Sequence, residues 1–511
     1  MQDGRTQCWW GMPGTAAVTA VDATYELFDQ APARGLFYSS NQLTVLDHFR
    51  VPYEVTPALA GGEVEHLYPA EGGPPLLWTR NLDGPVVAST LLGADQVTPI
   101  TFFARSLSDE MIEPLLREHG GNWTRARIIT SADGDPVASI WRADDGRVFL
   151  PFDPNEVVES FWSERYLSTA IGPRGLCLRR SLMIGYYRAR PMLPRPMQIW
   201  LRRQFAHMQA RSAFPGWPVE TSLHDFFALM FAILAEISGD YIPCISPWPD
   251  GHRWALVLSH DVEHAAGLAA SGRVIELERF HGLRSSWNLV PRRYDIDPSF
   301  VSDLIEAGFE VGVHGMYHDG RDLESWSTWQ DRLPIAYEAA ERWGAVGFRS
   351  AASHRRSDWM RSLRFDYDSS WPDTDPYEPQ SGGCCTWLPF FNGELVELPV
   401  TLRQDHTLFV ILGHQDETAW VEKTNFLRAR GGMALIDTHP DYLVDDRIFN
   451  AYARFLERFG DDATAWRALP REVSAWWRRR AQSWLEYDGS TWQVAGPAEL
   501  EGRVSFEGGT W

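Results

Sequence analysis

Lysine, cysteine and long apolar runs are scarce in this 511-residue chain. Lys423 is the single lysine, so nearly all basic residues are arginines, and we attach no function to this preference for arginine. The five cysteines are odd in number and lack C-x-x-C spacing, so they indicate neither a disulfide framework nor a thiolate zinc site. No stretch reaches the ~20 apolar residues of a membrane span, and the start of the chain lacks the pattern of a signal peptide. We therefore expect a cytoplasmic protein without membrane insertion.

Basic residues are also fewer than acidic ones: the chain has 47 basic and 68 acidic residues, which gives a net charge of −21. Nucleic acids and anionic membranes are bound through clustered basic side chains, so the balance argues against both as partners. With 44% apolar residues the chain can bury a large core, and its length suits two or three domains. The oligomeric state stays open, and a homo-oligomer is compatible with the sequence.

The spacing of apolar runs divides the chain into five parts. We expect an N-terminal tail over residues 1–35, a small α/β domain of unknown role over 36–152, a mainly helical connecting region over 153–240, a barrel over 241–480, and a short β-rich tail over 481–511. The first α/β domain has neither a phosphate-binding glycine pattern nor a nucleophile elbow.

Strand and helix patterns alternate between residues 254 and 436. We expect strands at residues 254–259, 285–290, 309–313, 345–348, 395–400, 408–412 and 433–436. Asp297 and Pro298 have the pattern of a helix N-cap followed by proline in the first turn, and Gly308 ends that helix. Six or seven such units predict an α/β fold built on a distorted (β/α) barrel of parallel strands, with its active site at the carboxyl ends of the strands.

Five short polar segments follow these strands in fixed order. They are His260-Asp-Val-Glu263, His314-Gly-Met-Tyr-His318, Gly347-Phe-Arg349, Asp368-Ser-Ser-Trp371 and Asp437-Thr-His439-Pro440. Each alone is weak evidence, because two histidines four apart or two nearby carboxylates occur often by chance. Their joint position at strand ends predicts one metal hydrolase site.

A divalent metal that activates water needs three protein ligands and one open position. His314 and His318 can turn toward one ion from a single loop, and the third ligand must come from elsewhere. Asp261 and Glu263 lie on the same side of an extended strand end, so one can bind the metal while the other takes a proton from water. The alternatives are two ordinary polar histidines and a solvated acidic turn.

These segments resemble the polysaccharide deacetylase family, the NodB-homology hydrolases that remove acetyl groups from glycans. The resemblance covers about residues 247–480. It implies that Asp261 is the catalytic base, that Arg349 pairs with it, and that His439 is the general acid. Glu263, His314 and His318 would then bind one divalent metal ion, for which we expect zinc, with cobalt, nickel or iron as alternatives.

Other residues are expected to support this chemistry. A histidine acid needs a carboxylate neighbour that stabilises its charged form, for which Asp437 and Asp368 are candidates. The family places an aromatic side chain against the acetyl methyl group. Trp371 and Trp387 are candidates for this wall of the substrate groove, or are core residues.

Two features depart from the family pattern. Glu263 stands where many members have aspartate, which leaves open whether it or a nearby histidine is the third ligand. Ala351 and Ala352 follow the third segment in place of proline and an aromatic residue. His260, His264 and His354 are additional candidate ligands, although structural roles suit them better.

The sequence thus predicts a metal-dependent hydrolase that removes an acetyl or other N-acyl group from a carbohydrate or glycan precursor. One alternative is an amidohydrolase that acts on a non-sugar cyclic amide. The other is a glycan-binding or scaffold protein without turnover. Intact His314 and His318 favour the metal-dependent enzyme.

Overall fold

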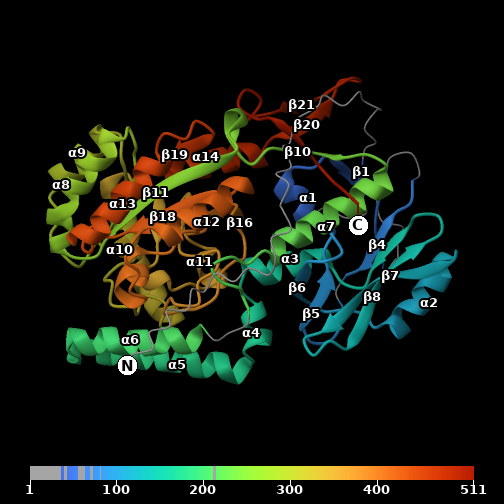
Figure 1. Ribbon diagram of the computed structural model, residues 1–511, viewed down its shortest axis with the longest axis horizontal. Coiled ribbons are helices and arrows are strands. Elements are labelled where there is room, and N and C mark those ends of the chain that lie inside the picture. The colour runs from blue at the N-terminus through green and yellow to red at the C-terminus, as the bar shows by residue number, and fades with distance from the viewer. Residues whose placement is uncertain are drawn as a thin grey trace, which may run out of the picture. The chain divides into compact units, whose positions relative to one another are not determined.

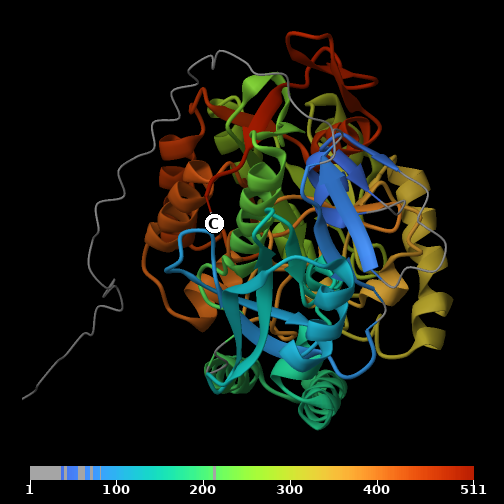
Figure 2. The same ribbon diagram turned by 90° about the vertical axis from the view of Figure 1, so that its right-hand side faces the viewer.

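The computed structural model describes residues 36–38, 43–55, 64–69, 73–80, 82–210 and 214–510 (Figures 1 and 2). The tail expected over residues 1–35 lies outside this part of the chain. No helix among the described residues is long and apolar enough to cross a membrane.

The first part of the chain forms a nine-stranded sheet in which most neighbouring strands are antiparallel. Its order is β2-β1-β3-β4-β9-β8-β7-β5-β6. The strands are β1 (Leu36–Tyr38), β2 (Tyr53–Val55), β3 (Val64–Pro69), β4 (Leu76–Thr79), β5 (Val87–Leu92), β6 (Pro99–Ala104), β7 (Trp123–Ser131), β8 (Pro136–Ala143) and β9 (Val148–Leu150). Helices α1 (Thr44–Phe49), α2 (Asp109–His119) and α3 (Pro154–Trp162) belong to the same region.

Helix α7 (Ser222–Ser238) lies against this sheet, as Figures 1 and 2 show. Most of its side chains are buried, because its sequence is almost entirely apolar between His224 and Ile237. It shares one hydrophobic core with β4, β6 and α3. Gly239 ends the helix in the left-handed conformation, with φ 71°.

Between α3 and α7 the chain forms further helices. They are α4 (Tyr166–Ala170), α5 (Pro173–Ala189), the short 3₁₀ turn η1 (Arg190–Met192) and α6 (Arg195–Gln209). Helix α4 packs on β5, while α5 and α6 stand apart from the sheet in Figure 1. Helices α5 and α6 run side by side, and we call residues 173–209 the helical hairpin.

The second large sheet is parallel except for its edge pair β16 and β17. Its order is β16-β17-β15-β14-β13-β12-β11-β18, and β19 also pairs with β11. The strands are β11 (Trp254–Val262), β12 (Ser286–Leu289), β13 (Glu310–His314), β14 (Gly347–Arg349), β15 (Tyr367–Asp368), β16 (Phe390–Asn392), β17 (Leu395–Glu397), β18 (Met433–Thr438) and β19 (Ala465–Ala468). A parallel bridge from Leu402 to Ile436 links the chain after β17 to β18, which curls the sheet toward a barrel.

Helices alternate with these strands: α8 (Ala265–Phe280), α9 (Pro298–Glu306), α10 (Trp326–Trp343), α11 (Ser357–Met360), α12 (Thr418–Ala429), α13 (Asp446–Phe459) and α14 (Pro470–Ala481). Every residue of β11 is buried, as expected for a parallel strand covered on both faces. The predicted start of α9 is confirmed, because the Asp297 carboxylate accepts a hydrogen bond from the backbone N–H of Ser299. The predicted fold class, a distorted barrel of parallel strands preceded by an α/β domain, is also confirmed.

One predicted strand is wrong. Residues 408–412 do not form a strand, because His406–Ile411 is a short π-helical segment, η4. Leu408, Phe409 and Ile411 are buried within it. A short apolar run has the same composition in a buried helix and in a buried strand, so sequence periodicity could not separate them.

The last residues return to the start of the barrel region. Strand β10 (Ile242–Ile245) pairs with β22 (Val504–Glu507), and β20 (Trp484–Tyr487) pairs with β21 (Trp492–Ala495). The buried guanidinium of Arg480 donates hydrogen bonds to the carbonyl oxygens of His48 and Ile245. This side chain therefore joins α14 to α1 and to β10.

Candidate active site

The carboxyl ends of the parallel strands bring the predicted polar segments together. Asp261 lies near the end of β11, His314 and Arg349 end β13 and β14, and Asp437 lies near the end of β18. Neighbouring parallel strands end at the same edge of a sheet, which explains why residues far apart in sequence meet here. All four of these side chains are buried.

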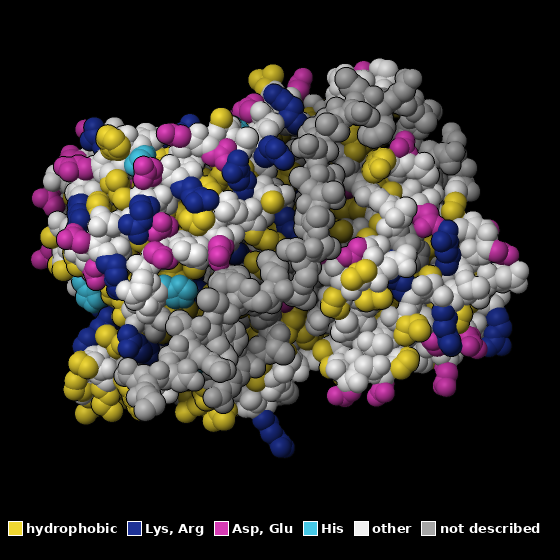
Figure 3. All heavy atoms as spheres, viewed as in Figure 1, with side chains coloured by type: hydrophobic (Ala, Val, Ile, Leu, Met, Phe, Trp, Pro, Cys, Tyr) yellow, Lys and Arg dark blue, Asp and Glu magenta, His cyan; other side chains and the backbone are white. Residues whose placement is uncertain are grey.

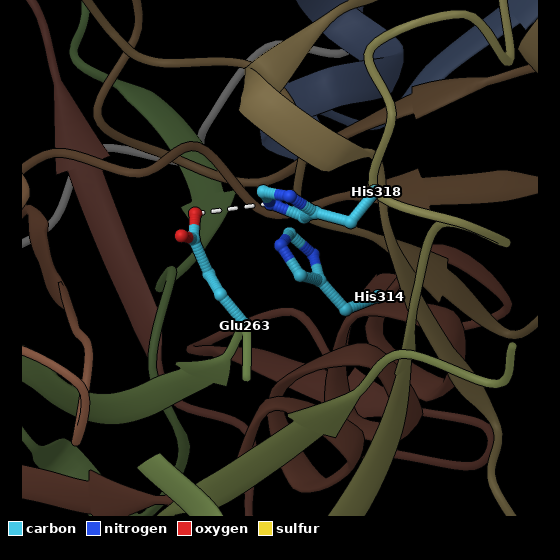
Figure 4. Close-up of side chains that lie close together, drawn as sticks. All are labelled: Glu263, His314 and His318. Atoms are coloured by element: carbon cyan, nitrogen blue, oxygen red, sulfur yellow. Dashed lines mark ion pairs between the residues drawn. The ribbon is translucent and has the colours of Figure 1, made fainter. Parts of the chain in front are cut away.

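Glu263, His314 and His318 form one group that could hold a metal ion, because one ligand atom from each lies within 4.8 Å of the others. Figure 4 shows both imidazole rings beside the carboxylate. Nε2 of His318 lies 3.0 Å from Oε1 of Glu263. Nε2 of His314 is buried without a hydrogen-bond partner among the described residues, which is unfavourable unless a cation binds there. These three side chains therefore fit a divalent metal.

The protonation of this group also suits metal binding. Burial lowers the pKa of His314 to about 4, so its ring is neutral at pH 7. Burial opposes ionisation of Glu263, but the neighbouring His318 outweighs it and holds the pKa of this carboxylate well below its usual range. Two imidazoles and one carboxylate are the donor set of many catalytic zinc sites.

The backbone around His318 is held in an unusual conformation. His318 has φ 54° and Gly315 has φ 58°, both in the left-handed region. A Cβ at Gly315 would lie 3.0 Å from a carboxylate oxygen of Asp322, so glycine is the residue that fits best there. Arg293 donates a 2.6 Å hydrogen bond to the carbonyl oxygen of His318 and fixes the loop from the other side.

Asp261, Asp437 and His439 form a second group with suitable ligand atoms. A guanidinium already occupies this position, because Nη1 of Arg349 lies 3.0 Å from Asp261 and 2.7 Å from Asp437. Arg349 is itself held by the carbonyl and hydroxyl oxygens of Ser369. Among the described residues no arginine lies within ion-pair distance of Glu263, so we assign the metal position to Glu263, His314 and His318.

Asp261 has the environment of an ionised base. Its Oδ1 accepts hydrogen bonds from Asn288 at 2.8 Å and from Arg349 at 3.0 Å, and its Oδ2 lies 3.5 Å from Nε2 of His314. Burial opposes ionisation, but the charge of Arg349 is the main effect that outweighs it and keeps the pKa of Asp261 well below its usual range. Burial and the adjacent Asp261 instead raise the pKa of Asp437, although Arg349 opposes this shift.

His439 has the opposite environment. Its Nδ1 lies 2.6 Å from Oδ1 of Asp405, and its backbone N–H donates to Oδ2 of the same carboxylate. Burial disfavours the imidazolium, but Asp405 outweighs it and raises the pKa of His439 well above its usual range. His439 is therefore protonated at neutral pH, with Nε2 4.0 Å from Glu263.

The carboxylate that contacts His439 was not among the residues predicted from the sequence. Asp405 makes the direct contact, whereas Asp437 adds a weaker charge effect. Asp368 accepts a hydrogen bond from Ser370 instead. Asp405 was missed because it follows no predicted strand end and precedes the run that was assigned as a strand. Its one sequence signal is the pair Asp405-His406, two polar residues before a buried apolar turn.

The two tryptophans expected at the substrate groove are buried. Trp371 is 1% exposed, and Trp387 stacks on His224 with 3.4 Å between ring centroids. Neither lines the cavity beside Glu263, so their burial favours the core interpretation. His260 also has a structural role, because its two ring nitrogens contact Thr438 and Glu278.

A cavity of about 80 Å³ adjoins Glu263 and His318. Its walls come from His406 and Tyr442 of the barrel region and from side chains of the helical hairpin. Sequence reasoning did not predict this contribution, since the hairpin ends more than forty residues before β11 begins.

The barrel has a fold similar to those of several solved structures. A Mycobacterium smegmatis protein assigned as a polysaccharide deacetylase is 18% identical, with a TM-score of 0.38 over 46% of this chain and 93% of that chain. The Puue allantoinase is 15% identical, with a TM-score of 0.37 over 45% and 91%. A protein of Pseudomonas aeruginosa PAO1 assigned as a polysaccharide deacetylase is 14% identical, with a TM-score of 0.37 over 45% and 92%.

No family model and no curated protein matches the chain. The structural neighbours are thus polysaccharide deacetylases and an allantoinase, at low identity and over less than half of this chain. At these identities and TM-scores, function has to be inferred from the side chains of the site.

Proposed function

We propose that the protein is a metal-dependent hydrolase that removes an acetyl or other N-acyl group from a carbohydrate or glycan precursor. The observation that carries this proposal is the geometry of two buried groups beside one candidate metal group: the Asp261 carboxylate held by Asn288 and Arg349, and the His439 imidazole held by Asp405. Hydrolysis of an amide needs both a base and an acid at one centre.

Glu263, His314 and His318 would hold the metal. Two imidazoles and one carboxylate suit zinc with an open position for water, although the same donors also bind iron(II). When bound, the ion would polarise the acyl oxygen and lower the pKa of water.

The two protons of the reaction are handled by residues of this chain. Asp261 takes a proton from the attacking water, while Asn288 and Arg349 keep its carboxylate in place. His439 gives its Nε2 proton to the leaving nitrogen, and Asp405 holds the ring through Nδ1. The products are a free amine and a carboxylate, so the reaction consumes one water molecule.

The test is to measure acetate release from a panel of N-acetylated amino sugars together with metal content by elemental mass spectrometry. We expect about one equivalent of metal in the wild type, loss of that metal in His318→Ala, and acetate release only with metal present. Wild-type rates in both Asp261→Asn and His318→Ala would show that the reaction occurs elsewhere.

A small cyclic amide is the second candidate substrate. The small size of the cavity beside Glu263 favours this class, because the cavity of about 80 Å³ has room for a compact group. Ring opening of allantoin and related amides would be followed by loss of the ring chromophore or by liquid chromatography. Binding of sugars without turnover of any amide would instead favour the glycan-binding alternative.

A further inference from the structure

The helical hairpin has a charge composition opposite to that of the chain. Residues 173–209 contain eight arginines and no aspartate or glutamate, whereas the chain carries a net charge of −21. On the face drawn in Figure 3, the hairpin at the lower left displays basic and hydrophobic side chains, while the barrel above it carries both signs. Such a local excess of positive charge attracts anions.

The hairpin packs against the loop that carries His318. Tyr187 of α5 is buried and packs edge-on against His354, with ring centroids 5.0 Å apart. A Cβ on Gly320 would lie 2.1 Å from the ring of Tyr187, so the absence of a side chain at Gly320 lets this ring approach the loop that carries His318.

Three hairpin arginines, Arg190, Arg195 and Arg202, line the same cavity as Glu263 and His318. Two carboxylates, Glu263 and Glu378, line this cavity as well, so its arginines exceed its carboxylates by one. Within the part of the chain that the structure describes, no carboxylate lies within ion-pair distance of Arg190 or Arg195. Arg195 donates a 3.1 Å hydrogen bond to the hydroxyl of Tyr442, and Arg190 lies 3.5 Å from a side-chain oxygen of Gln198.

Arg202 is compensated only in part. Its Nη2 lies 3.6 Å from Glu378, whose other oxygen accepts a hydrogen bond from Thr407. Its Nη1 is buried and has no hydrogen-bond partner among the described residues. A buried guanidinium nitrogen without an acceptor is costly, and an oxyanion in the adjoining cavity would satisfy it.

We infer that the substrate is a small acylated molecule that carries an oxyanion, a carboxylate or a phosphate ester, and that Arg190, Arg195 and Arg202 bind this group. This inference rests on the proposed function for the position of the acyl group. The hairpin closes one side of a cavity of about 80 Å³, which favours a small molecule over a long polymer. Arginine binds carboxylates and phosphates through paired hydrogen bonds, so both sources fit.

A second, larger cavity shares wall residues with the first. It has a volume of about 400 Å³ and shares Tyr187 and Pro379 with the metal cavity. Arg179, Arg180 and Arg356 also line it. Glu324 and several apolar side chains complete its lining, so this cavity is basic only in part.

The first test measures anion binding without catalysis. Inorganic phosphate is titrated into protein freed of metal by chelation, and heat is recorded by calorimetry. We expect the double change Arg190→Gln and Arg195→Gln to weaken phosphate binding about tenfold or more. The double change Arg190→Lys and Arg195→Lys should restore part of the affinity, because it keeps both positive charges. Arg174→Gln is the matched control, because Arg174 is an exposed arginine of the same hairpin and lines neither cavity. Equal affinities in the double variant and the control would overturn the inference.

The second test compares kcat/KM for N-acetylglucosamine, its 6-phosphate and an N-acetylated uronate. In the wild type and in Arg174→Gln, we expect kcat/KM to be about a hundredfold higher for one or both anionic sugars than for the neutral sugar. The double variant should lose most of this preference, mainly because its KM for the anionic sugars rises. The two anionic substrates separate phosphate from carboxylate. A preference for the neutral sugar would overturn the inference.

The two tests distinguish a failure of the proposed deacetylation from a failure of the anion site. Arginine-dependent phosphate binding without acetate release from any sugar would retain the anion site and reject the proposed deacetylation. Acetate release with no arginine-dependent anion binding would retain the hydrolase and reject the anion site.

Discussion

Oδ1 of Asp405 lies 2.6 Å from Nδ1 of His439, and both side chains are buried. The contact fixes the orientation of the ring and holds its pKa well above the usual range despite burial. The backbone N–H of His439 binds the second oxygen of the same carboxylate. Asp405 is therefore a positioning residue for the proposed general acid, because it acts through the imidazole.

Replacement of Asp405 by asparagine should lower kcat by about 10²- to 10³-fold. The pKa of His439 falls when the carboxylate is lost, so the ring gives up its proton at a lower pH. The high-pH limb of the kcat profile should then move toward lower pH, while metal content stays near one equivalent. Asp358→Asn, at an exposed site, is the control. A profile that keeps its high-pH limb in Asp405→Asn would contradict this role.

Asp261→Asn and His314→Ala should separate catalysis from metal binding. Asparagine cannot take the proton from water, so turnover should fall to background while the metal remains bound. His314→Ala removes a proposed ligand and should lose the metal itself. Elemental mass spectrometry and acetate release on the same samples check both results. If Asp261→Asn loses the metal and His314→Ala does not, Asp261 is a metal ligand and not the base.

The fold and much of the site could be predicted because their signals are local. Asp261, His314, Arg349 and His439 each follow a short apolar run, and parallel strands carry such residues to one edge. Asp405 could not be found this way, since its contact with His439 depends on the path of the chain after β17. The arginines of the hairpin were missed for a similar reason. Their position beside the metal group is set by packing between Tyr187 and a distant loop, which no local pattern encodes.

Glu310 should make the stability of the barrel depend on pH. Burial raises the pKa of this carboxyl to about 7, although it accepts hydrogen bonds from Tyr367 and from the backbone N–H of Arg471. Between about pH 4.5 and 7 the unfolded chain therefore holds fewer protons at this site than the folded protein. Stability is fully present below this window and falls by up to about 3 kcal/mol as the pH rises through it.

Glu310→Gln removes this titration, so the variant should lose less stability than the wild type between pH 5 and 7.5. Urea unfolding at several pH values, followed by tryptophan fluorescence, measures the difference. Glu338→Gln, at a surface site paired with two exposed arginines, is the control and should keep the wild-type pH dependence. Identical slopes for Glu310→Gln and wild type would place the pKa of Glu310 near its ordinary value.

The buried ion pair between Glu164 and Arg355 should contribute strongly to the stability of the folded chain. Nε and Nη2 of Arg355 donate to the two carboxylate oxygens at 2.7 and 2.5 Å, and the residues lie 191 positions apart in sequence. Glu164→Gln leaves the guanidinium buried without its counter-charge, which should cost about 3 kcal/mol of the free energy of unfolding. Glu159→Gln, whose partner Arg165 is exposed, should cost less than about 1 kcal/mol. Equal urea midpoints for the two variants would show that solvent reaches Arg355 and that the pair does not tie the connecting helices to the barrel.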